Sequence, residues 1–305
     1  MMRTIIFLSL FFLAFSVSGQ DSSASLDEVI YGRKDGMALT MIVGQPAKDI
    51  QKNRAVINLV SGNWVSGYQK RMGYLLRADV FIKRGYTVFT VFTSSQPRYN
   101  IIEEIGDVKR AIRYVRYNAK EFNIDPDKIG IVGSSSGGHL ALMAATASDS
   151  TLISDDPVDK VSSRVQAAGV FFPPTDFLNY GHEGYDSRAS EMFITLSRLG
   201  GAFDFRKFDN IKGVYKSVTD SATRKILAGQ ISPIYQVTPD DPPIILFHGD
   251  NDRLVPIQQS ERMVEALTKA GDVNKLVIKK GGGHGWPKIE VEENEIADWF
   301  DRYLK

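Results

Sequence analysis

The sequence predicts an α/β protein in which a mostly parallel central sheet is flanked by helices. Short β-branched and apolar runs end at Gly, Pro, Asn or Asp, and longer segments of helical periodicity lie between them. Most of the short runs are apolar throughout, as strands buried on both faces of a parallel sheet are. The chain has 305 residues, 43% of them hydrophobic and 24% charged, which is the composition of a globular protein.

The first 19 residues are expected to be a signal peptide that is removed before Gln20. Arg3 precedes an apolar run from Ile5 to Val17, and this run is shorter than the roughly 20 residues that span a bilayer. A retained N-terminal anchor is the alternative. Residues 20–305 are expected to form a single domain that is secreted to the periplasm or the exterior, with no stable membrane insertion after cleavage.

The charge and cysteine content exclude several classes of function. The formal net charge is +1 and no basic cluster is present, so a nucleic-acid partner is not expected. The chain contains no cysteine, which excludes a thiol nucleophile and a lipidated N-terminal cysteine. No metal and no organic cofactor is expected, and the oligomeric state stays open.

Strands and helices alternate along the chain. The predicted strands are at residues 38–43, 55–60, 87–93, 128–132, 165–171, 244–247 and 274–279. Helices are predicted at residues 102–122, 136–147, 261–270 and 290–303. Within the first helix, Lys109, Arg110, Arg113 and Arg116 are expected to form a solvated face, with an anion site as the alternative.

Residues 173–243 interrupt this alternation between the strands that end near 171 and begin near 244. The segment is far longer than a strand connection needs, and we expect a cap over the active site. A peripheral insertion without a role in substrate choice is the alternative. Aromatic residues of this region are expected either to line a substrate pocket or to form the core of the cap: Phe172, Tyr180, Tyr185 and Phe193.

A strand, a turn and a helix meet at the motif G-x-S-x-G, with Ser135 at its centre. The strand and helix backbones pass close together at such a turn, so the residues two before and two after the serine must be small. Gly133 and Gly137 meet this requirement. Ser136 is the alternative nucleophile, but Ser134 would then stand where the motif needs glycine. The run matches neither G-x-G-x-x-G nor the Gly-Lys-Ser/Thr ending of a phosphate loop.

Four histidines compete for the role of general base: His139, His182, His248 and His284. In hydrolases with this serine turn, an acid and then a histidine follow the nucleophile along the chain. His284 alone fits, because it lies in a Gly-Gly-Gly-His-Gly-Trp run after the last predicted strand. His139 is expected to be a packed structural residue, and His248 is expected to support the acid loop.

The loop after the strand at 244–247 reads His-Gly-Asp-Asn-Asp-Arg-Leu-Val-Pro and offers two carboxylates. Asp252 is predicted to orient the histidine, while Asp250 holds the turn. Asp250 as the orienting acid is the alternative. Such a carboxylate fixes the histidine tautomer and stabilises the imidazolium without taking the proton.

Two loops are expected to supply the amides that bind an oxyanion. The Ser136 amide lies at the start of a helix, where the helix dipole favours negative charge. Gly62 and Asn63, after an early strand, are the second source of donors, although the same segment could be a plain tight turn. Trp64, Ser134 and His182 are expected to contact substrate. For His182, which lies in the cap, a plain loop role is the alternative.

With these motifs in place, the chain from about Val29 onward resembles the α/β-hydrolase superfamily. The similarity is to secreted bacterial esterases of the BD-FAE, acetylxylan and feruloyl esterase type, to hormone-sensitive-lipase-like carboxylesterases, and to the catalytic domain of prolyl oligopeptidases. The resemblance carries the catalytic triad onto Ser135, Asp252 and His284. It departs at Ser61-Gly62-Asn63, where these esterases have a glycine run after histidine.

The resemblance implies a serine carboxylesterase that forms an acyl-enzyme on a small-molecule or carbohydrate ester, such as an acetyl or feruloyl ester of a polysaccharide. A serine peptidase or amidase of the prolyl-oligopeptidase type is the enzymatic alternative. A binding protein on a catalytically inactive scaffold is the alternative from a different class.

Overall fold

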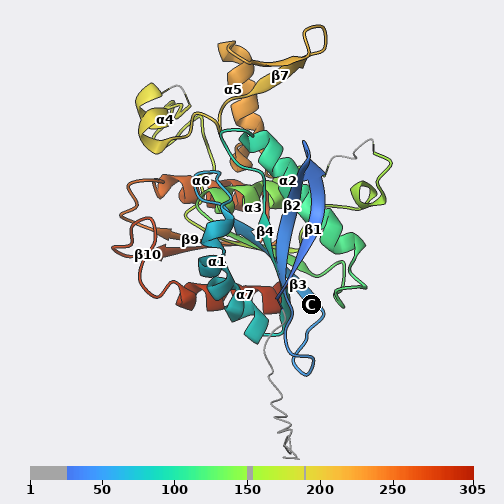
Figure 1. Ribbon diagram of the computed structural model, residues 1–305. Helices are drawn as coiled ribbons and strands as arrows, with labels where there is room; N and C mark the ends of the chain where they lie inside the picture. Colours follow the sequence, from blue (N-terminus) through green and yellow to red (C-terminus); the bar gives the residue numbers. More distant parts are fainter. Residues whose placement is uncertain (1–25, 150–153, 189) are drawn as a thin grey trace, which may run out of the picture.

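An eight-stranded sheet forms the centre of the protein (Figure 1). The structure is a computed structural model that describes residues 26–149, 154–188 and 190–305. The strand order is β1-β2-β4-β3-β5-β6-β9-β10, in which the β1–β2 and β2–β4 pairs are antiparallel and the other five pairs are parallel. The mostly parallel sheet is thus confirmed. Its strands are β1 Leu26–Lys34, β2 Met37–Gly44, β3 Arg54–Val60, β4 Tyr86–Phe92, β5 Ile129–Ser134, β6 Ala167–Phe171, β9 Ile244–Gly249 and β10 Asn274–Lys279.

Helices cover both faces of this sheet. α1 (Arg71–Lys83) and α7 (Glu290–Tyr303) pack on one face, where Phe81 and Phe300 join a core with Phe171 and Phe247. The opposite face carries α2 (Ile101–Tyr117), α3 (Ser136–Thr146) and α6 (Gln258–Ala270), whose apolar residues belong to the larger core. This is the α/β-hydrolase arrangement that the resemblance implies.

The strand β1 was not predicted. It pairs only with β2, at the edge of the sheet, and a register irregularity separates Ile30 from Gly32. Tyr31 is its one fully buried residue and donates a hydrogen bond from its hydroxyl to the Phe92 carbonyl at 2.9 Å. An edge strand with a single buried side chain lacks the apolar run by which the inner strands are recognised.

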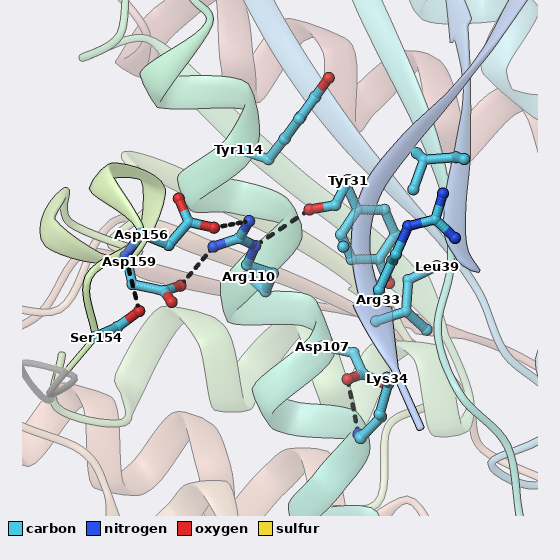
Figure 2. A pocket seen from close by; sticks show the side chains of 12 residues that line it. Tyr31, Arg33, Lys34, Leu39, Asp107, Arg110, Tyr114, Ser154, Asp156 and Asp159 are labelled. Carbon is cyan, nitrogen blue, oxygen red and sulfur yellow. Dashed lines mark hydrogen bonds and ion pairs between the residues drawn. The ribbon is translucent and has the colours of Figure 1, made fainter. Parts of the chain in front are cut away.

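The expectation that the arginines of α2 form a solvated face is wrong. Arg110 lies 2.7 Å from both Asp156 and Asp159, as Figure 2 shows, and it also donates to the Tyr31 carbonyl. Arg113 is 3% exposed and pairs with Asp149 at 2.7 Å. Asp149, Asp156 and Asp159 lie beyond α3 in the sequence, so protein carboxylates rather than water alone contact this face, and Lys109, Arg110 and Arg116 are half-buried.

The described residues between β6 and β9 form two α-helices, two strands and the short helix η3 (Pro233–Tyr235), and α4, α5 and β7 lie above the sheet in Figure 1. The buried carboxylate of Asp176 anchors the segment, because it accepts hydrogen bonds from the Leu178 and Asn179 amides and from Tyr235, and pairs with Arg262 on α6. The α-helices and strands are α4 Glu191–Ser197, β7 Arg206–Asp209, β8 Val214–Ser217 and α5 Ser221–Gln230.

The expected signal peptide, residues 1–19, lies outside the described residues. Within residues 26–149, 154–188 and 190–305, no helix has both the length and the apolar character needed to cross a bilayer.

The parallel strands place the candidate site residues at one edge of the sheet. Ser135 follows β5, Phe172 follows β6, Asp252 lies just beyond β9, and His284 lies beyond β10. The carboxyl ends of parallel strands open on the same edge, where α/β proteins form their ligand crevices. The fold therefore brings together residues that are up to 149 positions apart in the sequence.

Candidate active site

Ser135 occupies a strained turn between β5 and α3. Its backbone has φ 55° and ψ −124°, a combination that a residue with a side chain rarely adopts. The turn is held by the Ser135 amide, which donates to the Phe171 carbonyl at 2.9 Å. A Cβ atom at Gly133 would lie only 2.2 Å from the Gly137 carbonyl oxygen, so the close approach of strand and helix requires glycine there.

The side chains of Ser135, His284 and Asp252 form a continuous hydrogen-bonded chain. Ser135 Oγ lies 2.9 Å from His284 Nε2, and His284 Nδ1 lies 2.7 Å from Asp252 Oδ2. The ring of Phe172 packs against the imidazole with a centroid separation of 4.4 Å. An ionised Asp252 accepts the Nδ1 hydrogen, which leaves the Nε2 lone pair directed at the serine hydroxyl.

Asp252 is held as an anion despite its burial. Burial alone would raise its pKa, but hydrogen bonds from His248, from His284 and from the Val255 amide outweigh that effect and hold the pKa of Asp252 well below its usual range. Its Oδ1 accepts the amides of Leu254 and Val255 at 2.9 and 3.0 Å. Hydrogen bonds and the neighbouring His284 therefore favour the charged form of the carboxylate.

Asp250, the alternative acid, has a different environment. It is exposed, and its Oδ1 accepts the Gly281 amide at 2.6 Å, which ties the acid loop to the glycine run before His284. The two loops approach so closely that a Cβ atom at Gly249 would lie 2.2 Å from the Gly282 carbonyl oxygen. The glycines thus let the loop that carries His284 lie directly against the loop that carries Asp252.

The loop after β3 faces the start of α3. The hydroxyl groups of Ser61 and Ser136 lie 2.9 Å apart and connect the two segments. Asn63 and Trp64 adopt left-handed backbone angles, with φ 54° and 53°. The Gly62 amide already donates to the Val65 carbonyl at 3.1 Å, so it is not available as a donor in this conformation.

Gln96 is a site residue that sequence reasoning missed. Its backbone amide donates to the Trp64 carbonyl at 3.0 Å, and its side-chain amide donates to the Asn63 carbonyl. Its Oε1 accepts the Ala202 amide at 3.0 Å, so the same side chain ties the 63–64 turn to the insertion. A glutamine in a loop after a strand carries no motif, and no signal in the sequence singles it out.

A largely apolar cavity lies beside Ser135. Trp64 forms part of its wall, and its indole N–H donates to His139 Nδ1 at 3.2 Å. Tyr180, from the insertion, lines the same cavity and donates its hydroxyl to the Leu254 carbonyl at 2.8 Å. Further residues of the lining are Pro174, Phe177 and Leu199.

Two residues expected to contact substrate lie elsewhere. Ser134 is buried in β5, and its hydroxyl accepts a hydrogen bond from Arg77 Nη1 at 3.2 Å. His182 is exposed, packs against Tyr185 with a ring separation of 5.0 Å, and does not line the cavity beside Ser135. The side chain of Phe193 lies outside what the structure describes.

The two remaining histidines have structural partners. His139 is fully buried, its Nε2 lies 2.7 Å from the Ile231 carbonyl, and burial lowers the pKa of His139 to about 4. His248 Nδ1 lies 2.7 Å from Ser260 Oγ and its Nε2 lies 2.8 Å from the Val255 carbonyl, which supports the acid loop as expected. Among the described residues, no group of three His, Asp or Glu side chains is arranged to hold a metal ion.

Comparison with known proteins gives relatives along most of the chain. The BD-FAE family model matches residues 42–267. Esterase LipQ of Mycobacterium tuberculosis is 29% identical over 71% of this chain and 46% of its own length. The acetylxylan esterase of Xylanibacter ruminicola is 26% identical over 76% of this chain and 41% of its own length. The chain thus spans about half the length of the curated relatives it matches.

A solved structure is similar over nearly the full length of both chains. It is a truncated form of a carbohydrate esterase from gut microbiota, with a TM-score of 0.72 and 28% sequence identity. The alignment covers 94% of this chain and 98% of that one.

Proposed function

The chain belongs to the BD-FAE family, and from this premise we propose that it is a carboxylic ester hydrolase with Ser135 as its nucleophile. The observation that carries the proposal is the hydrogen-bonded chain from Ser135 Oγ through His284 to Asp252, with separations of 2.9 and 2.7 Å. A serine, a histidine and a carboxylate in this order form the machinery of acyl transfer.

In the proposed reaction, Ser135 Oγ attacks the ester carbonyl carbon while His284 Nε2 accepts the hydroxyl proton. The tetrahedral intermediate expels the alcohol, which takes that proton from His284 and leaves an acyl group on the serine. Water then attacks the acyl-enzyme with His284 again as base, and the carboxylic acid and the serine are released. Asp252 stabilises the imidazolium in both steps without accepting the proton.

The oxyanion of each tetrahedral intermediate is proposed to bind the amides of Ser136 and Asn63. Ser136 is the first residue of α3, where backbone N–H groups have no partner within the helix. Asn63 lies on the facing turn, which Gln96 holds by two hydrogen bonds. Gly62, whose amide is already engaged, contributes the close backbone approach rather than a donor.

The substrate is proposed to be an acetyl or feruloyl ester of a carbohydrate. The apolar cavity beside Ser135 suits the acyl group, and similar proteins are named a carbohydrate esterase and an acetylxylan esterase. The insertion is proposed to act as a cap within a single 20–305 domain, because Tyr180, Phe177 and Leu199 supply part of that cavity wall. Export from the cell, which would bring the enzyme to such a polymer, remains part of the proposal.

Hydrolysis of p-nitrophenyl acetate tests this function, with the three neighbouring serines as matched variants. Ser135→Ala should lower kcat by about 10⁴-fold or more, because the triad acts as a unit. Ser134→Ala should retain kcat within about tenfold, since its hydroxyl contacts Arg77 and no reacting atom. Full activity in Ser135→Ala together with loss in Ser136→Ala would move the nucleophile by one residue. An anilide substrate assayed in parallel separates esterase from amidase activity.

A further inference from the structure

A groove that shares Asn63 with the cavity beside Ser135 carries two cations that have no acidic partner among the described residues. It is lined by Gly62 and Asn63 of the oxyanion loop, by Lys70 at the end of η1 (Tyr68–Lys70), and by Arg198 just after α4. Both cationic side chains are exposed, and among the described residues neither forms an ion pair. The described lining of this groove contains no Asp or Glu.

Another pocket of the protein differs in charge. In the pocket that Figure 2 shows, Lys34 pairs with Asp107 at 2.7 Å, and Arg110 pairs with two aspartates. These two cations are neutralised by carboxylates of the protein itself, and Arg33 is the one cation of that lining outside an ion pair among the described residues. In the groove beside Asn63, by contrast, no carboxylate of the described lining neutralises the positive charge, which is therefore available to a bound anion.

The groove is close to the reaction centre. Lys70 Nζ lies 3.6 Å from the position that a Cβ atom on Gly62 would occupy, so the ammonium group lies over the oxyanion loop itself. Asn63 lines both this groove and the cavity that holds Ser135. A carbonyl group bound at Asn63 would therefore lie beside both the apolar cavity and the cationic groove.

We propose that this groove binds a carboxylate on the alcohol portion of the ester, so that the preferred substrate is an acylated acidic sugar such as a uronic acid. This inference rests on the proposed function and adds a substrate class to it. The apolar cavity takes the acyl group, and the open groove takes the carbohydrate to which that group is attached. Lys70 supplies a mobile point charge, while the Arg198 guanidinium offers paired donors that match a carboxylate.

A matched pair of substrates tests the proposal. The first is the methyl glycoside of O-acetylated glucuronic acid, and the second is the same acetyl ester with the carboxylate converted to a primary amide. The wild-type enzyme should hydrolyse the acid with a kcat/KM about three- to tenfold higher than the amide, the range expected of partly exposed ion pairs. The preference should shrink as ionic strength rises.

Variants of the two groove cations test whether the groove causes the preference for the acid over the amide. Lys70→Gln and Arg198→Gln should each reduce kcat/KM for the acid and leave kcat/KM for the amide within about twofold of wild type. Lys120→Gln removes an exposed cation that lies just beyond the C-terminal end of α2 and outside the groove lining, and it should preserve the preference. Equal wild-type turnover of acid and amide would overturn the proposal, and so would an equal loss on both substrates in Lys70→Gln. Failure to hydrolyse the acid, the amide and p-nitrophenyl acetate alike would instead overturn the proposed function.

The side of the ester that carries the charge is tested with p-nitrophenyl esters. The p-nitrophenyl monoester of adipic acid has its carboxylate on the acyl portion, and p-nitrophenyl hexanoate is its uncharged counterpart. Lys70→Gln should change the turnover of these two esters by the same factor. A selective loss on the adipate ester would place the bound carboxylate on the acyl side and contradict the proposal.

Discussion

Asp252 Oδ2 lies 2.7 Å from His284 Nδ1, while Asp250, two residues earlier, accepts the amide of Gly281 instead. The two aspartates share one loop, which directs the buried carboxylate of Asp252 and the exposed carboxylate of Asp250 to different partners. Asp252 thus contacts the imidazole of His284, whereas Asp250 contacts the backbone of the adjoining turn.

The two aspartates should therefore respond differently to the same substitution. Asp252→Asn should lower kcat by about 10³–10⁴-fold, because the amide no longer favours the tautomer that leaves Nε2 unprotonated. Asp250→Asn removes a turn contact and should lower kcat by less than about tenfold. Ester hydrolysis by the two purified variants compares them, and an equal loss in both would show that Asp252 has no special relation to the base.

The serine turn should be intolerant of one added methyl group. Gly133→Ala places Cβ 2.2 Å from a backbone oxygen of Gly137 and should destabilise the fold by about 2–4 kcal/mol. Gly106→Ala is the matched control, since nothing lies within 4 Å of its Cβ position on α2 and helix propensity favours alanine by about 1 kcal/mol. Urea unfolding measures both. A stable Gly133→Ala variant would be inconsistent with this close approach.

Asp241 should make stability depend on pH. Burial raises the pKa of Asp241 to about 6, although hydrogen bonds from the Thr238 amide and hydroxyl partly oppose the shift. Because this value is above the ordinary value of about 3.9, the folded state holds the proton more tightly, and stability falls as pH rises from about 4 to about 6.

Asp241→Asn should remove this dependence. The variant and the wild type should be equally stable near pH 4, and the variant should gain about 1–2 kcal/mol relative to wild type above pH 7, after allowance for solvent screening. Thermal unfolding across this range measures the difference. A constant difference at every pH would mean that Asp241 does not titrate in this window.

Ser135, Asp252 and His284 could be predicted because each of them lies in a short motif that can be recognised from neighbouring residues alone. The serine turn needs glycines at fixed positions, and the acid and base follow in chain order after recognisable strands. The inner strands were predicted for the same reason, since burial on both faces gives continuous apolar runs.

The parts that sequence reasoning missed depend on segments that meet only in the fold. The sequence pattern of an amphipathic helix places Arg113 on the surface. In the fold, Arg113 is buried because Asp149, from a later segment, packs against it. Gln96 matters through the carbonyl groups of residues more than 30 positions away, and its partners have no sequence signature. The engaged amide of Gly62 is likewise a property of backbone geometry, which the sequence of that loop does not encode in any motif.

The most direct test of the central claim is covalent labelling with a fluorophosphonate, followed by mass spectrometric location of the adduct. The reagent reacts with a serine that an adjacent base activates. We predict one adduct on Ser135 in the wild-type protein and none in Ser135→Ala, with fragmentation that resolves it from Ser134 and Ser136. An adduct on another serine, or a folded wild-type protein that fails to react, would contradict the assignment of Ser135 as the nucleophile.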